Sequence, residues 1–359
     1  MKIILYLLLL SCLACRGKEQ LYTRLICDAL GRNVLLPDTI KRVVCLRSSA
    51  IRMVTYAGGS DFICGVEESE TQENHEYTHL FAHPELLRKP IVGPRMGGDA
   101  ELLMLARPDV IFMASTTIGE ANELQSRIGI PVIALEYGDM GRKRSVFCYS
   151  LQLIGEVLHT QKQVDTLICF INRQLDDLQN RVEGLVQVED VYVGGISYRG
   201  QKGLTSTDPY YAALELLDIY NVASELDTSV VSAIAGTYID WEQLIEWNPD
   251  LIFVDVSGWP LVEQEFKTYA KLNQLLQAYA TKQIYLLWPY NNYHSNFDVM
   301  LVNAWYVGKV LFPEHFEDIS MKQKINEIMF YFVGDTIANQ LITCWGKHQN
   351  VFDRLKNNE

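Results

Sequence analysis

Two stretches of the sequence decide the fold: residues 99–112, which read DAELLMLARPDVIF, and residues 240–253, which read DWEQLIEWNPDLIF. Aligned at a constant offset of 141 residues, they are identical at seven of fourteen positions: Asp99/Asp240, Glu101/Glu242, Leu103/Leu244, Pro108/Pro249, Asp109/Asp250, Ile111/Ile252 and Phe112/Phe253. In each copy an Asp predicts the start of a helix, a Glu lies in its first turn, and Pro-Asp ends the helix before an apolar strand. A repeat of this kind indicates two duplicated lobes.

Short apolar runs and helical patterns alternate on both sides of each repeat. The expected strands are residues 42–46, 110–113, 132–135, 191–193, 251–254 and 284–287, and the expected helices include 48–56 and 119–128. Strands that alternate with helices favour a mostly parallel sheet. The sequence therefore predicts an α/β fold in each half of the chain.

Residues 161–183 contain no Pro or Gly and carry apolar residues at helical spacing. They predict an amphipathic helix about 35 Å long. We expect it to connect an N-terminal lobe (16–158) to a C-terminal lobe (187–359), with 159–186 as the connecting segment. The alternative is a core helix of one large domain.

Composition restricts the function. The formal net charge of −13 and the lack of a dense basic run argue against nucleic-acid binding. The sequence has no Gly-x-Ser-x-Gly elbow, Walker loop, HExxH or strand-linked GxGxxG motif, which favours a binding protein over an enzyme. An exported α/β hydrolase and a ligand-sensing surface protein without a transport role remain alternatives.

The first residues predict export. Lys2 precedes the apolar run of residues 3–10, which is too short for a membrane-spanning helix of about 20 residues and is typical of a signal peptide, here 1–15. The following Ser11-Cys12-Leu13-Ala14-Cys15 resembles a bacterial lipobox, in which a cysteine is acylated. Either Cys12 or Cys15 is the expected lipid anchor, and a plain cleaved signal peptide is the alternative. The expected location is the periplasm or cell surface.

Several segments in this order resemble the single-helix-hinge class of ABC substrate-binding proteins, which serve vitamin B12, ferric siderophores, haem and molybdate. They are the lipobox-like segment, Pro37 to Leu46, Ile91-Val92-Gly93 before Asp99, residues 107–111, 129–132, the long helix, residues 248–252 and 311–316. The resemblance implies a monomer of two Rossmann-like lobes with a ligand cleft between them. It implies no cofactor apart from a metal in the ligand. It also implies that Glu101 and Glu242 dock on the permease, which works with its ATPase.

Loops that follow the parallel strands are the expected ligand contacts. They supply Arg47, Ser48, Arg95, Met96, Thr116, Tyr137, Tyr198, Arg199, Lys202, Tyr210, Trp259, Tyr290, Tyr293 and His294. The four cations among them favour an anionic ligand, and the aromatic residues suit a metal chelate. His294 is the candidate metal ligand, and a site of His75, His79 and His83 is a weaker alternative because Pro84 interrupts the helix. The ligand stays open between a ferric siderophore or other iron complex, haem, cobalamin and molybdate.

Overall fold

The computed structural model describes residues 22–357 apart from 72–76, 95–96, 198–199, 228–230, 232–235 and 292–295. The expected signal peptide and the lipobox cysteines Cys12 and Cys15 lie outside the described residues. In the described part, no helix combines the length and apolar character that a bilayer crossing requires.

The N-terminal lobe contains a four-stranded parallel sheet in the order β4-β3-β5-β6. Its strands are β3 (Val43–Leu46), β4 (Ile63–Gly65), β5 (Val110–Ala114) and β6 (Val132–Leu135). Its helices are α2 (Ser48–Tyr56), α3 (Thr78–Ala82), α4 (Ala100–Ala106), α5 (Ile118–Ile128) and α6 (Arg144–Leu158). The predicted alternation of strands and helices is confirmed.

The C-terminal lobe contains a five-stranded sheet in the order β11-β10-β7-β8-β9. Strands β7 (Val191–Gly194), β10 (Leu251–Asp255) and β11 (Ile284–Leu287) are parallel, and the short β8 (Ser206–Thr207) and β9 (Thr237–Tyr238) are antiparallel. The surrounding helices are α8 (Ala212–Glu215), α9 (Trp241–Trp247), α10 (Trp259–Thr268), α11 (Ala270–Asn273), α12 (Gln277–Ala280) and α16 (Val351–Asn357). The two-lobed α/β fold predicted from the repeat is thus present.

A two-stranded antiparallel hairpin precedes the first sheet, and the sequence did not lead us to expect it. It consists of β1 (Tyr22–Cys27) and β2 (Asn33–Pro37). Arg24 attaches it to the end of α6 by donating to the carbonyl oxygens of Glu156 (2.6 Å) and Val157 (3.3 Å). The hairpin is held by contacts to residues far away in the chain.

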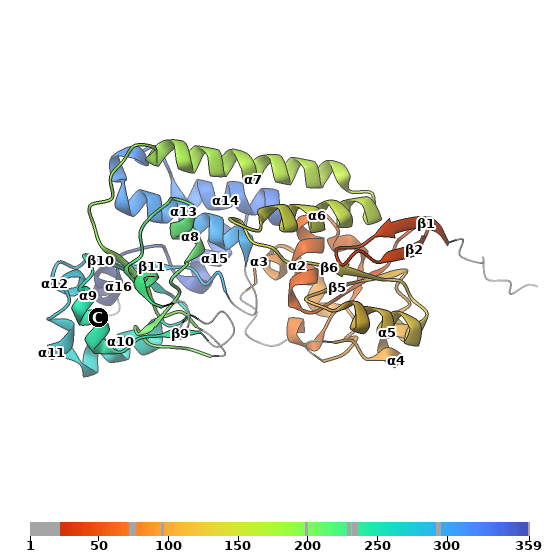
Figure 1. Ribbon diagram of the computed structural model, residues 1–359, viewed down its shortest axis with the longest axis horizontal. Helices are drawn as coiled ribbons and strands as arrows, with labels where there is room; N and C mark the ends of the chain where they lie inside the picture. Colours follow the sequence, from red (N-terminus) through yellow and green to blue (C-terminus); the bar gives the residue numbers. More distant parts are fainter. Residues whose placement is uncertain are drawn as a thin grey trace, which may run out of the picture.

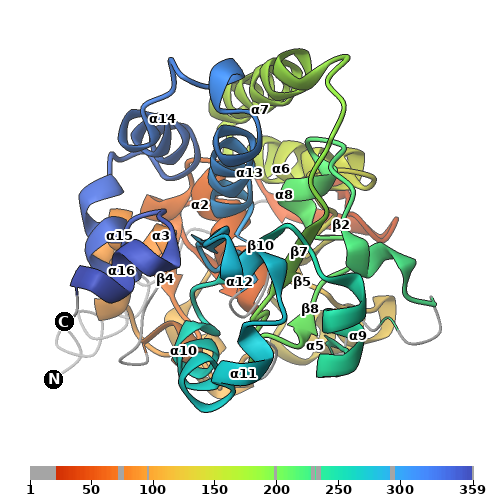
Figure 2. The same cartoon turned by 90° about the vertical axis from the view of Figure 1, so that its left-hand side faces the viewer.

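The helices α7 (Gln161–Val182), α13 (Phe297–Leu311) and α14 (Met321–Val333) form a layer above both sheets (Figures 1 and 2). Figure 1 shows α7 extending along the top of the molecule from one lobe to the other. Helix α14 packs on α2 and α3 of the N-terminal lobe, and α15 (Ala338–Trp345) follows it. The boundaries of the lobes stay a prediction, but the connection between them involves more helices than α7.

The two copies of the repeat have the same local structure. Asp99 caps α4 by accepting from the N–H groups of Glu101 and Leu102, and Asp240 caps α9 by accepting from that of Gln243. Each helix ends at a residue in the left-handed region, after which Pro-Asp leads into the central strand β5 or β10. The duplicated unit inferred from sequence is therefore a duplicated structural unit.

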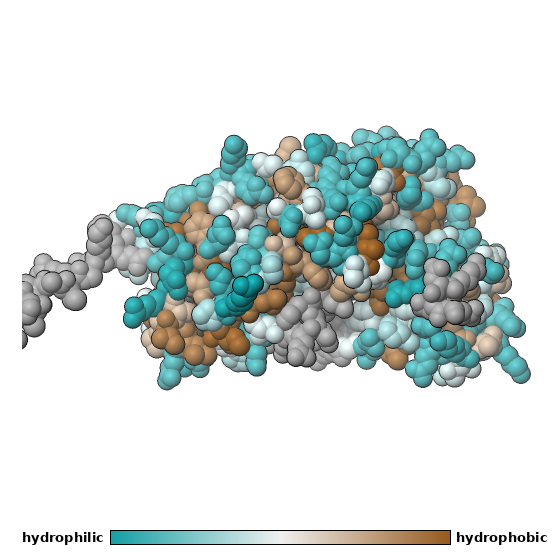
Figure 3. Space-filling model, turned by 180° about the vertical axis from the view of Figure 1, so that it is seen from behind, coloured by the Kyte–Doolittle hydropathy of each residue, from teal (hydrophilic) through white to brown (hydrophobic). Residues whose placement is uncertain are grey.

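The exposed sides of these two helices differ. On α4 the apolar side chains of Leu102, Met104 and Leu105 are exposed, Leu105 to 76%. Figure 3 shows hydrophobic residues gathered at the lower edge of this lobe, the edge along which α4 and α5 lie in Figure 1. At the equivalent positions α9 carries Gln243, Ile245 and Glu246. The N-terminal copy therefore has the more apolar surface.

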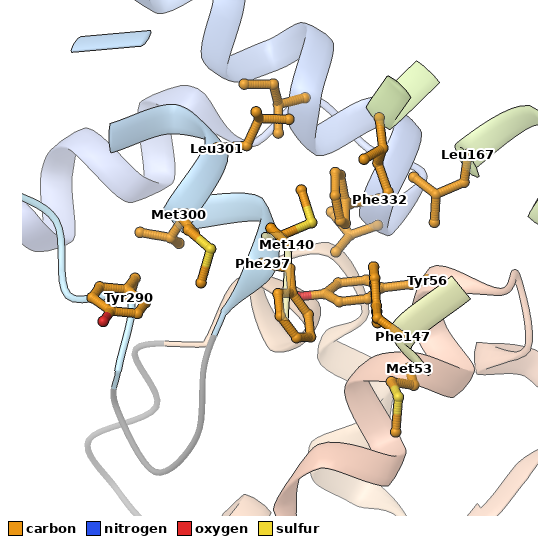
Figure 4. Close-up of a cluster of buried hydrophobic side chains, with 14 of the residues drawn as sticks. Met53, Tyr56, Met140, Phe147, Leu167, Tyr290, Phe297, Met300, Leu301 and Phe332 are labelled. Atoms are coloured by element: carbon orange, nitrogen blue, oxygen red, sulfur yellow. The ribbon is translucent and has the colours of Figure 1, made fainter. Parts of the chain in front are cut away.

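An apolar core joins the helical layer to the N-terminal lobe (Figure 4). The ring of Tyr56 on α2 lies edge-on to that of Phe332 on α14, with 5.0 Å between centroids. Phe147 on α6 lies 4.2 Å from Phe297 at the start of α13. These rings are buried to 0–1% exposure, so the layer and the lobe form one packed body.

Candidate functional site

Arg47 occupies the point where β3 ends and α2 begins, which is the carboxyl edge of the first sheet. Its guanidinium forms an ion pair with Glu120 (Nη2 to Oε1, 2.9 Å) and donates to the carbonyl oxygen of Ser115. Its backbone has φ 65° and ψ 136°, a conformation that residues other than glycine avoid. Arg47 is therefore fixed at both its backbone and its side chain.

Glu120 is a residue of this site that we did not single out from the sequence. Its carboxylate also accepts from the N–H of Thr117 (2.9 Å) and the hydroxyl of Thr116 (3.2 Å). The pairing with Arg47 and the hydrogen bond from Thr117 lower the pKa of Glu120 to about 2. The signal was present, because Thr117-x-x-Glu120 forms a capping box at the start of α5.

Glu67 is a second residue of the site that was not expected from the sequence, and unlike Glu120 it lies in no recognisable motif. Its side chain is buried to 2% exposure, and its two oxygens accept from the backbone N–H groups of Arg47 (2.8 Å) and Gly97 (2.9 Å). Burial raises the pKa of Glu67 to about 7, and the two hydrogen bonds oppose that rise. An acid with this pKa changes charge near neutral pH.

Tyr137, which follows β6, faces the interior of the molecule. Its ring lies 4.9 Å from that of Phe297, and its hydroxyl is hydrogen-bonded to Arg52. Burial raises the pKa of Tyr137 to about 12. The predicted contact residue is thus also part of the packing between the N-terminal lobe and α13.

A buried polar network surrounds Arg52. Its guanidinium carbon lies 4.9 Å from the ring centre of Tyr77, which stacks on His79. His79 is in turn bonded to Glu70 (3.0 Å). On the other side, Asp298 of α13 interacts with the hydroxyls of Thr78 and Tyr56. The network links α2 and α3 to α13.

The histidine alternative gains no support from these positions. Burial lowers the pKa of His79, which favours the neutral ring, and its Nε2 is hydrogen-bonded to Glu70. His83 contacts the carbonyl oxygen of Val333 (2.9 Å), and His75 lies outside the described residues. Across the described ranges, no three His, Cys, Asp or Glu side chains are grouped as a metal site.

Loops of the two lobes meet in a groove of about 700 Å³, lined by residues 139–142, parts of 209–224, Tyr290 and Met300. Arg142 crosses it, pairing with Glu215 (3.0 Å) and lying 5.7 Å from the ring centre of Tyr210. Tyr290 donates from its hydroxyl to Asp208 Oδ2 (2.7 Å). The groove contains two of the predicted aromatic contacts, Tyr210 and Tyr290.

The other predicted contacts of the C-terminal lobe are placed differently. Trp259 is the first residue of α10, and its side chain is only 4% exposed. It faces the core of the lobe because its ring packs against that of Phe266 on the same helix. Lys202 lies with its Nζ 5.7 Å from the ring centre of Tyr238. The described cations Arg47 and Lys202 thus each have a partner in their own lobe.

Arg95, Met96, Tyr198, Arg199, Tyr293 and the candidate metal ligand His294 lie outside the described residues. Ser48 is the first residue of α2, and only its backbone is described. Glu101 and Glu242, the predicted docking residues, are exposed in the first turns of α4 and α9.

Comparison with known proteins finds one matching family and a similar protein of known ligand. A model of the family described as periplasmic binding protein matches residues 43–290. The molybdate-binding protein MolA of Haemophilus influenzae is 27% identical over 345 residues, which cover 89% of this chain and 94% of MolA.

Two solved structures share the fold. That of Haemophilus influenzae MolA bound to molybdate has a TM-score of 0.66 at 22% identity and covers 88% of this chain and 99% of MolA. A periplasmic solute-binding protein from Veillonella parvula has a TM-score of 0.69 at 15% identity, covering 90% of this chain and 96% of its own. At these identities the likeness confirms the two-lobed architecture.

Proposed function

The chain belongs to the periplasmic binding protein family and is a solute-binding protein of an ABC importer; we propose that its solute is an oxyanion of the molybdate type. The observation that carries this proposal is the similarity to MolA over nearly the full length of both chains. The family is one of binding proteins, and the proposal assigns no catalysis to this chain.

The start of α2 supports an anionic ligand. The helix is nine residues long, and its N-terminus carries partial positive charge at the carboxyl edge of the parallel sheet. Arg47 adds a full positive charge at the same point. Because Glu120 pairs with Arg47, an oxyanion must share Arg47 with Glu120 or displace Glu120 from it.

A ligand panel tests the proposal. The purified protein without residues 1–15 is titrated with molybdate, tungstate, a ferric siderophore, haem and cobalamin in a thermal-shift assay and by calorimetry. We expect molybdate and tungstate to raise the melting temperature, because a ligand that binds only the native state stabilises it. A shift with haem, cobalamin or the ferric siderophore alone would reject the oxyanion.

Delivery requires the protein to be at the membrane. We propose that Cys12 or Cys15 is acylated after export, so that a short tether holds the two lobes near the permease. Metabolic labelling with a palmitate analogue should mark the full chain and one of the single variants Cys12→Ser and Cys15→Ser, but not the other. Unlabelled full-length protein would indicate a plain cleaved signal peptide.

A further inference from the structure

The carboxylate of Glu67 bridges two segments of the chain. One lies twenty residues before Glu67 in the sequence and the other thirty residues after it. Its Oε2 accepts from the N–H of Arg47, where α2 starts, and its Oε1 from the N–H of Gly97, which leads through Gly98 to the cap of α4. The side chain is almost fully buried. One acid therefore joins the start of α2 to the segment that leads into α4, the helix that carries Glu101.

Neighbouring contacts fix Glu67 itself. The N–H of Val66 bonds to the carbonyl oxygen of Pro90, and that of Glu68 bonds to the carbonyl oxygen of Gly93 (2.9 Å). Gly93 has φ 146°, and a Cβ there would lie 2.4 Å from the backbone nitrogen of Asp99. Because the flanking backbone is held so tightly, the bridge made by Glu67 has a defined position.

The conformation of Arg47 needs such support. A side chain at φ 65° is sterically strained, and backbone strain persists only where surrounding contacts impose it. Glu67 holds the backbone N–H of Arg47, and Glu120 holds its guanidinium. The two acids act on the same residue from opposite ends.

We propose that Glu67 is a positioning residue whose ionised carboxylate keeps the start of α2 in register with the segment leading into α4, and that anion affinity depends on this bridge. The inference rests on the proposed oxyanion function. The carboxylate accepts both N–H groups equally, whereas the protonated acid keeps only its carbonyl oxygen as a strong acceptor. Protonation of Glu67 therefore weakens one half of the bridge.

The charges around Glu67 come from three elements. Arg47 at the start of α2 favours its ionised form, and Glu70 in the 3-10 turn Glu68–Thr71 opposes it. Burial raises the pKa of the Cys45 thiol on β3, and the nearby carboxylate of Glu67 adds a smaller rise. Because the pKa of Glu67 is about 7, the bridge weakens as the pH falls from 8 to 6.

The variant Glu67→Gln tests the inference. Its amide keeps the shape of the side chain but places an NH₂ donor against one of the two N–H donors. Calorimetric titration with molybdate at pH 8 should show about a tenfold loss of affinity, the size expected for an unmatched buried group. The wild type should lose affinity several-fold between pH 8 and pH 6, and the variant should not. Glu68→Gln, an exposed neighbour, is the matched control and should behave as the wild type.

Unchanged affinity in Glu67→Gln would overturn the inference. So would wild-type affinity that rises as the pH falls, because Glu67 would then act by repelling the anion. Amide hydrogen exchange separates this test from the ligand assignment. Even if no molybdate binds, Arg47 and Gly97 should lose protection in Glu67→Gln, and in the wild type at pH 6, but not in Glu68→Gln. Equal protection in all three proteins would reject the bridge.

Discussion

At the scale of the residue, the carboxyl edge of the first sheet contains charges that are already paired. The guanidinium of Arg47 could bind an anion, but it already pairs with Glu120 and donates to the carbonyl oxygen of Ser115. Its strained backbone costs about 1–3 kcal/mol, which the surrounding contacts of the folded protein must offset. Strain of this kind is a reason to test Arg47 first.

Arg47→Ala should weaken molybdate binding by about 1.5–3 kcal/mol if the guanidinium donates to the anion. Glu120→Gln should strengthen binding several-fold, because it removes the competing carboxylate. Calorimetric titration measures both, and Arg127→Ala, an exposed residue of α5, serves as the control. If neither Arg47 nor Glu120 changes the affinity, the anion binds elsewhere.

Asp255 provides a pH-dependent prediction. It ends β10, and burial raises its pKa from 3.8 to about 6, although Ser257 donates to it. Because the folded pKa exceeds the unfolded one, the stability from this group is complete below about pH 4 and is lost as the pH rises to 6. In the wild type, this group should lower the free energy of unfolding by up to about 3 kcal/mol between about pH 4 and pH 6. Urea unfolding of Asp255→Asn should show no such decrease. Asp176→Asn, on the exposed side of α7, should follow the wild type; a parallel curve for Asp255→Asn would disprove the assignment.

At the scale of the element, the repeat explains why Pro-Asp follows both α4 and α9. Asp109 accepts from the N–H groups of Lys41 and Arg42 (2.7 and 2.9 Å), immediately before β3. Asp250 accepts from the N–H of Asp190 (3.0 Å), immediately before β7. In each lobe this aspartate therefore hydrogen-bonds the start of one central strand to the start of the strand beside it.

Asp109→Ala and Asp250→Ala should therefore each destabilise the protein by about 0.5–1.5 kcal/mol, the net contribution expected of hydrogen bonds to exposed N–H groups, which water can satisfy in their place. Chemical denaturation followed by circular dichroism measures the change. Asp176→Ala, an exposed aspartate outside both repeats, should cost less than about 0.5 kcal/mol. A loss in only one lobe would mean that the two aspartates are not equivalent.

At the scale of the whole molecule, the lobes are joined by a layer and not by one helix alone. Helix α14 rests on α2 and α3, and Asp298 of α13 reaches the hydroxyls of the same lobe. Packed helices of this kind resist large rotations. We expect ligand binding to move the lobes only slightly, so that docking surfaces on both lobes keep their spacing.

The pair Glu101 and Glu242 belongs to this scale, because one residue lies on each lobe. The double variant Glu101→Ala, Glu242→Ala should bind molybdate as the wild type does and lose at least about tenfold in cellular uptake, since two charge pairs with the permease are removed. The double variant Glu123→Ala, Glu246→Ala changes exposed glutamates on α5 and α9 and is the matched control. Normal uptake by the first variant would remove the docking assignment.

The elements whose causes lie within a few neighbouring residues could be predicted from the sequence. Helix α2 (Ser48–Tyr56) and strand β11 (Ile284–Leu287) have the bounds that the sequence predicted. Helix α7 ends at Val182, one residue before its predicted end. Caps, apolar periodicity and Pro-Asp breaks act within a few residues, and the repeat made them visible twice. The same signals led to the family, through the order of its segments.

The state of the site depends on contacts that form only in the folded protein. Glu67 and Glu120 act on Arg47 from twenty and seventy-three residues away, and no local pattern connects them. Trp259 was expected at the ligand but is buried in the core, and the hairpin of β1 and β2 depends on contacts with α6. Burial and charge pairing are set by segments that meet only after folding, so a sequence can supply the residue types of a site without revealing which of them are already engaged.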